Sequence, residues 1–232
     1  MRHLLGLISL ALVLASGAAQ AAERINVVAS FSILADMVRN VGGNDVDVVA
    51  LVGPDGDAHV YAPTPADAKK VADARLLVIN GLGFEGWLPR LLQASGSKAP
   101  IAVATKGIMP RKLGGHDDPH AWQSVANAKI YVANIRDGLI AAAPDKAAVF
   151  KANADAYLAR LEALDREVHE AVAKIPEVRR KVISTHDAFG YFADAYGITF
   201  FSPLSVSTDS EPSARDIAAI VAQIKLARSE EH

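Results

Sequence analysis

Residues 144–175 have the sequence PDKAAVFKANADAYLARLEALDREVHEAVAKI, in which apolar side chains recur at helical intervals. The intervals are 7, 4, 3, 4, 4 and 3 residues, and the positions are Phe150, Tyr157, Leu161, Leu164, Val168, Val172 and Ile175. This spacing predicts one apolar stripe along a single long helix. At ~1.5 Å per residue the helix is roughly 48 Å long, which exceeds the width of one small lobe. We therefore expect it to span two lobes and to fix their relative position.

Short β-rich runs alternate with helical patterns on the N-terminal side of this helix. The expected strands are residues 25–29, 46–52, 76–79 and 101–104, and the expected helices are residues 33–41, 65–74 and 84–94. The second helix has a clear beginning, because Thr64 suits an N-cap, Pro65 the first helical position and Asp67 the first turn. Strands and helices in this order predict a parallel sheet flanked by helices.

After residue 125 the pattern changes. Residues 126–142 and 144–175 are helical with no strand between them, and then the alternation returns with strands expected at 182–185 and 198–201 and helices at 189–196 and 212–227. We therefore predict an α/β protein with two parallel-sheet lobes joined by one long rigid helix, the second lobe being incomplete. The expected division is a signal peptide at 1–21, an N-terminal lobe at 22–125, a helical linker at 126–176 and a partial C-terminal lobe at 177–232.

The composition narrows the possible chemistry. The chain has 232 residues, of which 51% are hydrophobic and 22% charged, so it can bury a core. A formal charge of -2 gives no electrostatic reason to expect nucleic acid as a partner. The absence of cysteine excludes disulfides, thiolate chemistry, zinc-finger sites and iron–sulfur clusters. Any metal site in this chain must therefore use histidines and carboxylates.

The first residues are typical of a secretory signal peptide. Arg2 and His3 precede an apolar run at 4–15, and Ala19-Gln20-Ala21 provides a cleavage site before Ala22. A run of about a dozen residues is short of the roughly 20 that a spanning helix needs. Since no cysteine lies near the cleavage site, we expect a free periplasmic protein and not a lipoprotein.

Residues 81–86, GLGFEG, match the G-x-G-x-x-G pattern of dinucleotide-binding turns. In a dinucleotide fold this turn follows the first strand, and an acidic residue about 20 positions later holds the ribose. Here the turn follows the third expected strand, and no Asp or Glu occurs between Glu85 and Asp117. We therefore interpret the motif as a tight turn and not as a cofactor site.

Three of the seven histidines lie where ligands gather in α/β proteins. His59 follows an expected strand, His186 ends another in the second lobe, and His120 lies at the entry to the helices that join the lobes. Because ligands bind at the carboxyl ends of parallel strands and between lobes, we expect these side chains to face one inter-lobe cleft. Imidazole nitrogens favour a tetrahedral zinc site, whereas magnesium and calcium require oxygen ligands.

The remaining histidines carry weaker signals. His3 lies in the signal peptide and His232 is the last residue, while His169 shares the polar face of the long helix and is expected to be solvated. His116 lies in the loop Gly114-Gly115-His116-Asp117-Asp118, where it could capture metal as an accessory site or simply be exposed. We favour exposure for His116.

Several segments in order carry a family resemblance. They are VVASF at 27–31, DAHVY at 57–61 with Pro63 and Pro65, NGLGFE at 80–85, DPHAW at 118–122, THDAF at 185–189 and SEPS at 210–213. On these segments the chain resembles the solute-binding proteins of zinc and manganese ABC importers, the metal-receptor family that includes the high-affinity zinc receptors. The resemblance extends from about residue 25 to about residue 225.

The resemblance implies two α/β lobes, one long rigid helix and a metal ion in the cleft. His59, His120 and His186 match the first three ligand positions of the family. A third ligand that is histidine resembles the zinc-type members, whereas manganese-type members tend to carry Glu there. The family takes a carboxylate as fourth ligand from a region that matches nothing here. We therefore expect a truncated product, or a site completed by water or another carboxylate, and lower stability with some aggregation.

These observations predict a periplasmic receptor that captures Zn²⁺ and delivers it to an ABC-type permease. We expect a monomer, with a periplasmic metallochaperone as a further candidate partner and Mn²⁺ as a less favoured ligand. One alternative is a zinc hydrolase with an open water position, for which Asp187 and Glu211 are the available bases, although no H-E-x-x-H motif occurs. Others are a manganese receptor and a metal-binding adhesin.

Overall fold

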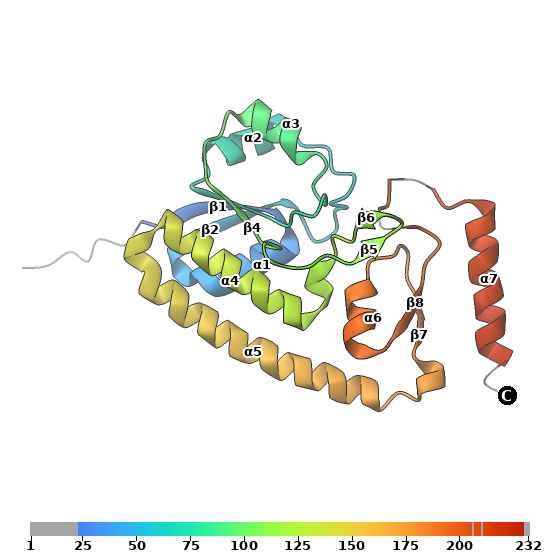
Figure 1. The fold of residues 1–232 in the computed structure, drawn as a ribbon. Coiled ribbons are helices and arrows are strands. Elements are labelled where there is room, and N and C mark those ends of the chain that lie inside the picture. The colour runs from blue at the N-terminus through green and yellow to red at the C-terminus, as the bar shows by residue number, and fades with distance from the viewer. Residues whose placement is uncertain (1–22, 206, 210, 230–232) are drawn as a thin grey trace, which may run out of the picture.

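The computed structural model describes residues 23–205, 207–209 and 211–229. The expected signal peptide, residues 1–21, lies outside these described residues. Within the described ranges, no helix combines the length and the apolar character that a membrane crossing requires. A body of sheet and helices sits on one long helix, and a smaller C-terminal part lies near the far end of that helix (Figure 1).

Four parallel strands form the sheet in the first half of the chain. In the order β2-β1-β3-β4 they are β2 (Val46–Val52), β1 (Ile25–Phe31), β3 (Leu76–Ile79) and β4 (Ile101–Val103). β1 lies inside the sheet, and its side chains are buried on both faces, which explains its nearly continuous apolar sequence. The predicted parallel sheet is confirmed.

Helices cover both faces of this sheet. Helices α1 (Ser32–Gly42) and α4 (Val125–Ala142) pack together on one side, and α2 (Pro65–Ala72) and α3 (Leu88–Ser95) pair on the other (Figure 1). α2 begins as predicted, because the Thr64 side chain accepts the Asp67 N–H and Asp67 accepts the Thr64 N–H.

Helix α3 begins four residues later than the sequence predicted. Gly81, Leu82 and Gly83 have φ angles of 87°, 54° and 79°, which a right-handed helix cannot contain. A side chain at Gly81 would also collide with Val103, because a Cβ there would lie 2.7 Å from a Val103 methyl carbon. Residues 81–86 therefore form a turn, as interpreted, and the helix starts only after it at Leu88.

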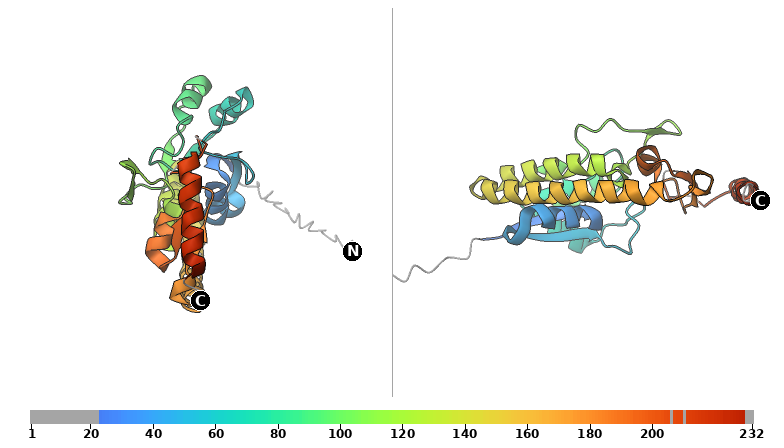
Figure 2. Two further views of the ribbon diagram at one scale, coloured as in Figure 1. Left: turned by 90° about the vertical axis from the view of Figure 1, so that its right-hand side faces the viewer. Right: turned by 90° about the horizontal axis from the view of Figure 1, so that it is seen from below.

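The single long helix is α5 (Ala147–Ala173), which has 27 residues and follows the 3₁₀ turn η3 (Pro144–Lys146). At ~1.5 Å per residue it is about 40 Å long. α5 lies side by side with α4, contacts α1, and near its other end meets α6 (Gly190–Tyr196), where Tyr196 donates to Asp165 over 2.7 Å (Figure 2). The prediction that this helix reaches both parts of the molecule is confirmed.

The apolar stripe of α5 is buried unevenly. Phe150 and Leu161 are buried beneath α1 and α4, whereas Leu164 is 44% exposed and Ile175, which lies beyond the helix, is 38% exposed. Near Leu164, α5 is contacted by Lys129 of α4, which pairs with Glu162, and by Tyr196 of α6, which donates to Asp165, and these contacts leave the stripe partly uncovered.

The C-terminal part contains a second, smaller parallel sheet. It consists of β7 (Lys181–Ile183) and β8 (Thr199–Phe201), connected through α6 and followed by α7 (Ala214–Ser229). The 3₁₀ turn η4 (Glu177–Arg179) directly precedes β7, whereas η1 (Gly43–Asp45) connects α1 to β2 in the first half of the chain. Figure 1 shows α7 standing apart from the long helix and from β7 and β8.

One hairpin was not predicted. Two-residue strands β5 (Lys112–Leu113) and β6 (His116–Asp117) pair antiparallel around Gly114 and Gly115.

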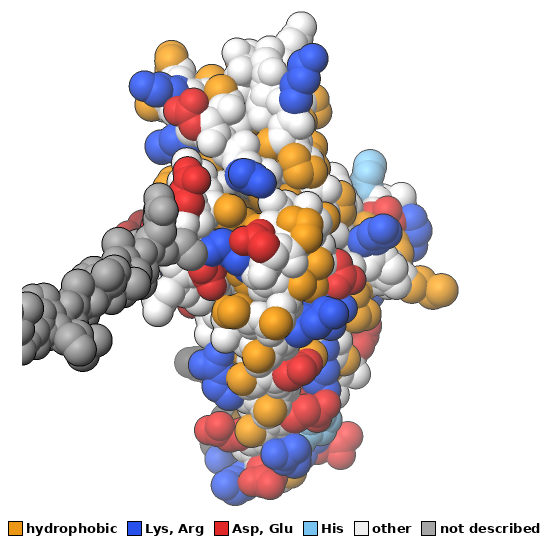
Figure 3. All heavy atoms as spheres, turned by 90° about the vertical axis from the view of Figure 1, so that its left-hand side faces the viewer, with side chains coloured by type: hydrophobic (Ala, Val, Ile, Leu, Met, Phe, Trp, Pro, Cys, Tyr) orange, Lys and Arg blue, Asp and Glu red, His pale blue; other side chains and the backbone are white. Residues whose placement is uncertain are grey.

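On the face drawn in Figure 3, basic and acidic side chains are interspersed and do not gather by sign. This distribution agrees with the small formal charge of -2.

Candidate metal centre

Three histidines that lie far apart in the sequence meet at one point. His59 lies on the loop after β2, His120 directly precedes the 3₁₀ turn η2 (Ala121–Gln123), and His186 follows β7. An isolated parallel bridge between His186 and Leu204, three positions beyond the last β7–β8 pair, holds the His186 backbone. Two of the histidines thus follow the carboxyl ends of parallel strands, where the sequence placed them.

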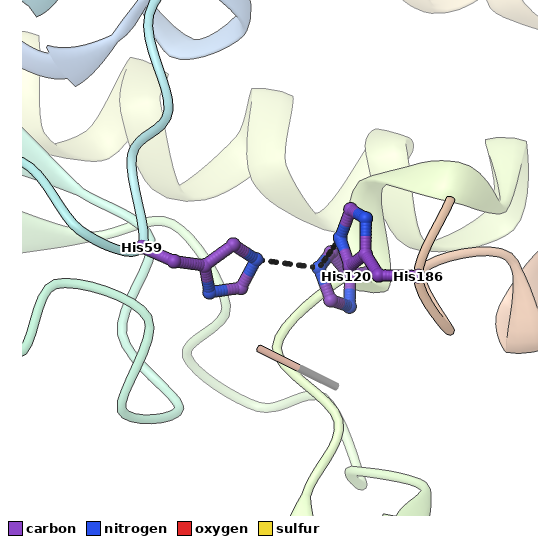
Figure 4. Close-up of side chains that lie close together, drawn as sticks. All are labelled: His59, His120 and His186. Atoms are coloured by element: carbon purple, nitrogen blue, oxygen red, sulfur yellow. Dashed lines mark hydrogen bonds between the residues drawn. The ribbon is translucent and has the colours of Figure 1, made fainter. Parts of the chain in front are cut away.

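The ring nitrogens of the three histidines converge (Figure 4). His120 Nε2 lies 3.1 Å from His59 Nε2 and 3.3 Å from His186 Nε2. One ligand atom from each residue lies within 4.8 Å of the others, and no other side chain in the described part of the chain joins this group. Nitrogens bound to tetrahedral zinc at ~2.05 Å are roughly 3.3 Å apart. The spacing therefore fits a zinc-sized cation between the rings.

His120 is fixed by a buried carboxylate. The Asp118 side chain is fully buried, and its Oδ1 lies 2.9 Å from His120 Nδ1 and accepts the His120 backbone N–H at 3.0 Å. Because Asp118 accepts a hydrogen bond from the Nδ1–H group, the Nε2 lone pair of His120 faces the cleft. Burial acts to raise the pKa of Asp118, but the hydrogen bonds from His120 and Arg111 outweigh it and lower the pKa. The carboxylate is therefore ionised and suited to orient the ligand.

The other two rings are neutral at physiological pH. Burial, together with the neighbouring His120 and His186, lowers the pKa of His59 to about 4. Burial and His120 also lower the pKa of His186. Neutral imidazoles are the form that binds metal, so few protons compete for these nitrogens at pH 7.

An aromatic wall surrounds the rings. The Phe84 ring meets His59 edge-on with centroids 4.7 Å apart, and Trp122 meets His120 at 5.3 Å. Phe31 packs against both Phe84 and Trp122 at 5.0 Å. These side chains line a cleft of about 530 Å³. An apolar wall limits access of water and strengthens the interaction between a cation and its nitrogen ligands.

The glycine-rich turn supports this wall. The Glu85 carboxylate accepts the backbone N–H groups of Asn80 at 2.6 Å and Gly81 at 3.1 Å, and the Ser30 hydroxyl at 2.6 Å. The turn therefore binds its own carboxylate where a dinucleotide turn would bind phosphate, and it holds Phe84 against His59. Burial raises the pKa of Glu85 despite these donors.

The other candidate residues lie outside the cluster. His116 is exposed on the β5–β6 hairpin, in agreement with the favoured interpretation. His169 is exposed on α5, where its ring meets Tyr196. Asp187 and Glu211, the bases considered for a hydrolase, are not in the ligand group found among the described residues. Asp118 and Arg111 received no role from the sequence, although an aspartate two residues before a histidine is a local signal for the turn seen here.

Comparison with known proteins places the chain in a family. The profile of the zinc-uptake complex component A family, described as periplasmic, matches residues 27–229. The chain belongs to this family. The resemblance on the histidine-bearing segments is thereby confirmed.

Members of the family differ in the metal their names carry. The manganese-binding lipoprotein MntA of Halalkalibacterium halodurans is 35% identical over 90% of this chain and 70% of its own length. The iron-binding protein YfeA of Yersinia pestis is 32% identical over 95% of this chain and 73% of its own. The solved periplasmic zinc-binding protein TroA of Treponema pallidum is 30% identical, with a TM-score of 0.84 over 88% of this chain and 75% of that one.

The family fixes the class of protein. The chain is an extracytoplasmic metal-binding receptor of an ABC importer and not an enzyme. The predicted α/β fold with a parallel sheet and a long helix is confirmed by the similarity to TroA. Since the relatives are named for manganese, iron and zinc, the metal that this chain carries is a separate question.

Proposed function

We propose that this protein captures Zn²⁺ with His59, His120 and His186 and delivers it to the permease of an ABC importer. The observation that carries the proposal is the meeting of three imidazoles, with Nε2 of His120 lying 3.1 Å from that of His59 and 3.3 Å from that of His186, in a ligand group that includes no carboxylate among the described residues. Nitrogen ligands suit zinc better than manganese, which favours oxygen ligands.

Each residue of the site has a defined part in capture. His120 is preset by Asp118, so its lone pair is directed into the cleft before the ion arrives. His59 is supported by Phe84 on one side and His186 lies across the cleft. Three nitrogens leave one position of a tetrahedral ion open, which water or a carboxylate fills.

We further propose that the protein is exported with the peptide at 1–21, acts as a free periplasmic monomer and receives metal from solution or from a metallochaperone. The absence of cysteine from the sequence supports a protein without a lipid anchor, although the relative from Halalkalibacterium halodurans is named a lipoprotein. His116 remains a proposed accessory group at most, because it is exposed and apart from the cluster.

Metal binding is tested by native mass spectrometry of the purified chain. We expect one Zn²⁺ per molecule, and we expect the double variant His59→Ala/His186→Ala to lose it, because one nitrogen ligand alone cannot hold the ion. His169→Ala is the matched control, since His169 is exposed on α5 and lies outside the cluster. Retention of Zn²⁺ by the double variant would overturn the assignment of the site.

Metal preference needs a separate measurement, because almost any nitrogen site ranks zinc above manganese. The informative quantity is therefore the change in the ratio of zinc to manganese affinity. We expect His186→Glu to lower that ratio, since it replaces a nitrogen ligand with oxygen. An unchanged ratio in competition titrations would contradict the proposal that the third imidazole sets the preference.

A further inference from the structure

Arg111 lies outside the ligand cluster but connects its two sides. Its Nη1 donates to Asp118 Oδ2 over 2.9 Å, and its Nε donates to Asp194 Oδ2 over 2.7 Å. Asp118 holds His120, and Asp194 lies on α6, which begins four residues after His186. One planar guanidinium thus joins the hairpin that precedes His120 to the helix that follows His186.

A second residue of α6 reinforces the same connection. The Tyr191 hydroxyl accepts the Arg111 backbone N–H and donates to the Asp118 carbonyl, each over 2.9 Å. The Asp118 N–H in turn donates to the Arg111 carbonyl over 2.9 Å. The Tyr191 hydroxyl therefore bridges the Arg111 N–H and the Asp118 carbonyl, which face each other just beyond the last pair of the β5–β6 hairpin, Lys112 and Asp117. The Arg111 guanidinium also lies over the Tyr191 ring, 5.7 Å from its centroid.

Arg111 packs so closely against α6 that no side chain fits at Gly190. A Cβ at Gly190 would lie 1.5 Å from Arg111 Nη1 and 2.4 Å from Cζ. Any side chain there would displace the guanidinium from Asp118. The guanidinium is thus packed against the backbone of α6, and its partner Asp118 is fully buried, whereas the Asp194 side chain is 64% exposed.

We propose that Arg111 is a positioning residue of the metal centre, because its guanidinium ties the hairpin that leads to His120 to the helix that follows His186. This inference rests on the proposed function. In it, Arg111 fixes the carboxylate that orients His120 and holds the two sides of the cleft at the separation that the ion needs. Loss of the connection speeds release of the bound metal while the three ligands remain.

The test compares Arg111→Gln with Arg136→Gln. Arg136 is a close match, since its side chain is 28% exposed and pairs with Asp137 over 2.7 Å, whereas that of Arg111 is 29% exposed and pairs with Asp194 over the same distance. We expect Arg111→Gln to raise the Kd for Zn²⁺ roughly 10- to 100-fold, mainly through faster release in stopped-flow chelator exchange. Arg136→Gln should stay within about twofold of wild type, because its partner touches no ligand.

Two further variants separate positioning from general destabilisation. Gly190→Ala keeps the arginine but displaces its guanidinium, and it should speed the release of bound Zn²⁺ as Arg111→Gln does. Arg111→Lys keeps the charge beside Asp118 but cannot reach two carboxylates with one planar group, and should give an intermediate rate. If Arg111→Gln does not fold, Arg111→Lys and Gly190→Ala decide the question.

A readout without metal keeps the inference distinct from the proposed function. In ¹⁵N-histidine spectra of the metal-free protein, the Nδ1 proton of His120 should exchange with solvent faster in Arg111→Gln than in wild type or Arg136→Gln. If the wild-type protein binds no Zn²⁺, the proposed function fails and this proton alone decides the role of Arg111. Unchanged proton exchange, or unchanged metal release in a wild type that binds Zn²⁺, would overturn the inference.

Discussion

The four-stranded region and the C-terminal region of this protein are packed very differently. In the former, residues 25–103 with α1, α4 and α5, strands β1 and β3 are buried almost throughout, and α1, α4 and α5 each bury apolar side chains in one common core. In the latter, residues 177–229, the buried apolar side chains among those described are Ala188, Tyr191, Tyr196 and Ile198. Aliphatic side chains of β7 are exposed, with Val182 at 42% and Ile183 at 50%.

This difference separates the ligands of the metal centre. His59 follows β2 of the packed region and is held by Phe84, and His120, which lies shortly before α4, is held by the buried Asp118. His186 belongs to the lightly packed region, and its backbone is held by the bridge to Leu204. One side of the cleft is thus preset and the other depends on a few cross-connections. A receptor that must both bind and release an ion needs one side of its binding cleft to be able to move.

The largest expected effect is on the free energy of unfolding, and it contrasts one substitution in the two regions. Phe150 is fully buried on α5, so Phe150→Ala should cost about 3–5 kcal/mol. Phe200 is only partly buried and stacks on Phe189 with ring centroids 4.8 Å apart, so Phe200→Ala should cost about 1–2 kcal/mol. Urea unfolding of both variants provides the measurement. Equal losses would contradict the difference in packing.

The next effect compares two helix N-termini with the same hydrogen-bonding pattern. Thr64 and Asp67 cap α2 in the packed region, and Ser213 and Asp216 cap α7 in the other, with each aspartate accepting the backbone N–H and hydroxyl of its partner. The buried Asp67 additionally accepts the Tyr61 hydroxyl at 2.7 Å. We expect Asp67→Asn to lower the free energy of unfolding by about 1–2 kcal/mol at pH 7. Asp216→Asn, on an exposed helix, should lower it by less.

The cost of Asp67→Asn should depend on pH. Burial acts to raise the pKa of Asp67, but hydrogen bonds from Thr64, Lys70 and Tyr61 outweigh it and hold the pKa well below its usual value. A lowered pKa contributes stability above the unfolded value of ~3.9, which is lost as the pH falls from there toward the folded value. The difference between Asp67→Asn and wild type should therefore be full at pH 7 and smaller at pH 2.5. A constant difference in urea unfolding would contradict this account.

Sequence patterns predicted the parts of the fold that burial dictates. The strands β2 and β3 have the predicted bounds because each is a short apolar run between turn residues. The N-cap at Thr64 was predicted because the four residues from Thr64 to Asp67 contain a capping hydroxyl, a proline at the first helical position and an acidic first turn. The β5–β6 hairpin was missed, since strands of two residues carry no periodicity. The start of α3 was misplaced because a glycine-rich turn that wraps around Glu85 still continues the apolar pattern of a helix.

The candidate site was predictable only in part, because its geometry depends on contacts between segments that are far apart in the sequence. Three histidines at element ends could be assigned to one cleft, but their mutual distances depend on how the two regions dock. The connection between Arg111 and Asp194 joins residues 83 positions apart, and no local rule pairs them. Long-range polar contacts of this kind follow from the finished packing and not from any periodicity in the chain.

The smallest expected effect on stability concerns the exposed aliphatic side chains of the C-terminal region. Ile183→Thr should change the free energy of unfolding by less than about 0.5 kcal/mol, because half of the side chain is in contact with water and threonine suits a strand equally well. It should nevertheless reduce concentration-dependent light scattering, since Val178, Val182 and Ile183 expose apolar surface near the edge of a two-stranded sheet. Arg24→Gln, far from this surface, is the control for scattering. A cost as large as that of Phe150→Ala would instead mean that the β7 side chains are covered in solution, and the contrast between the two regions would disappear.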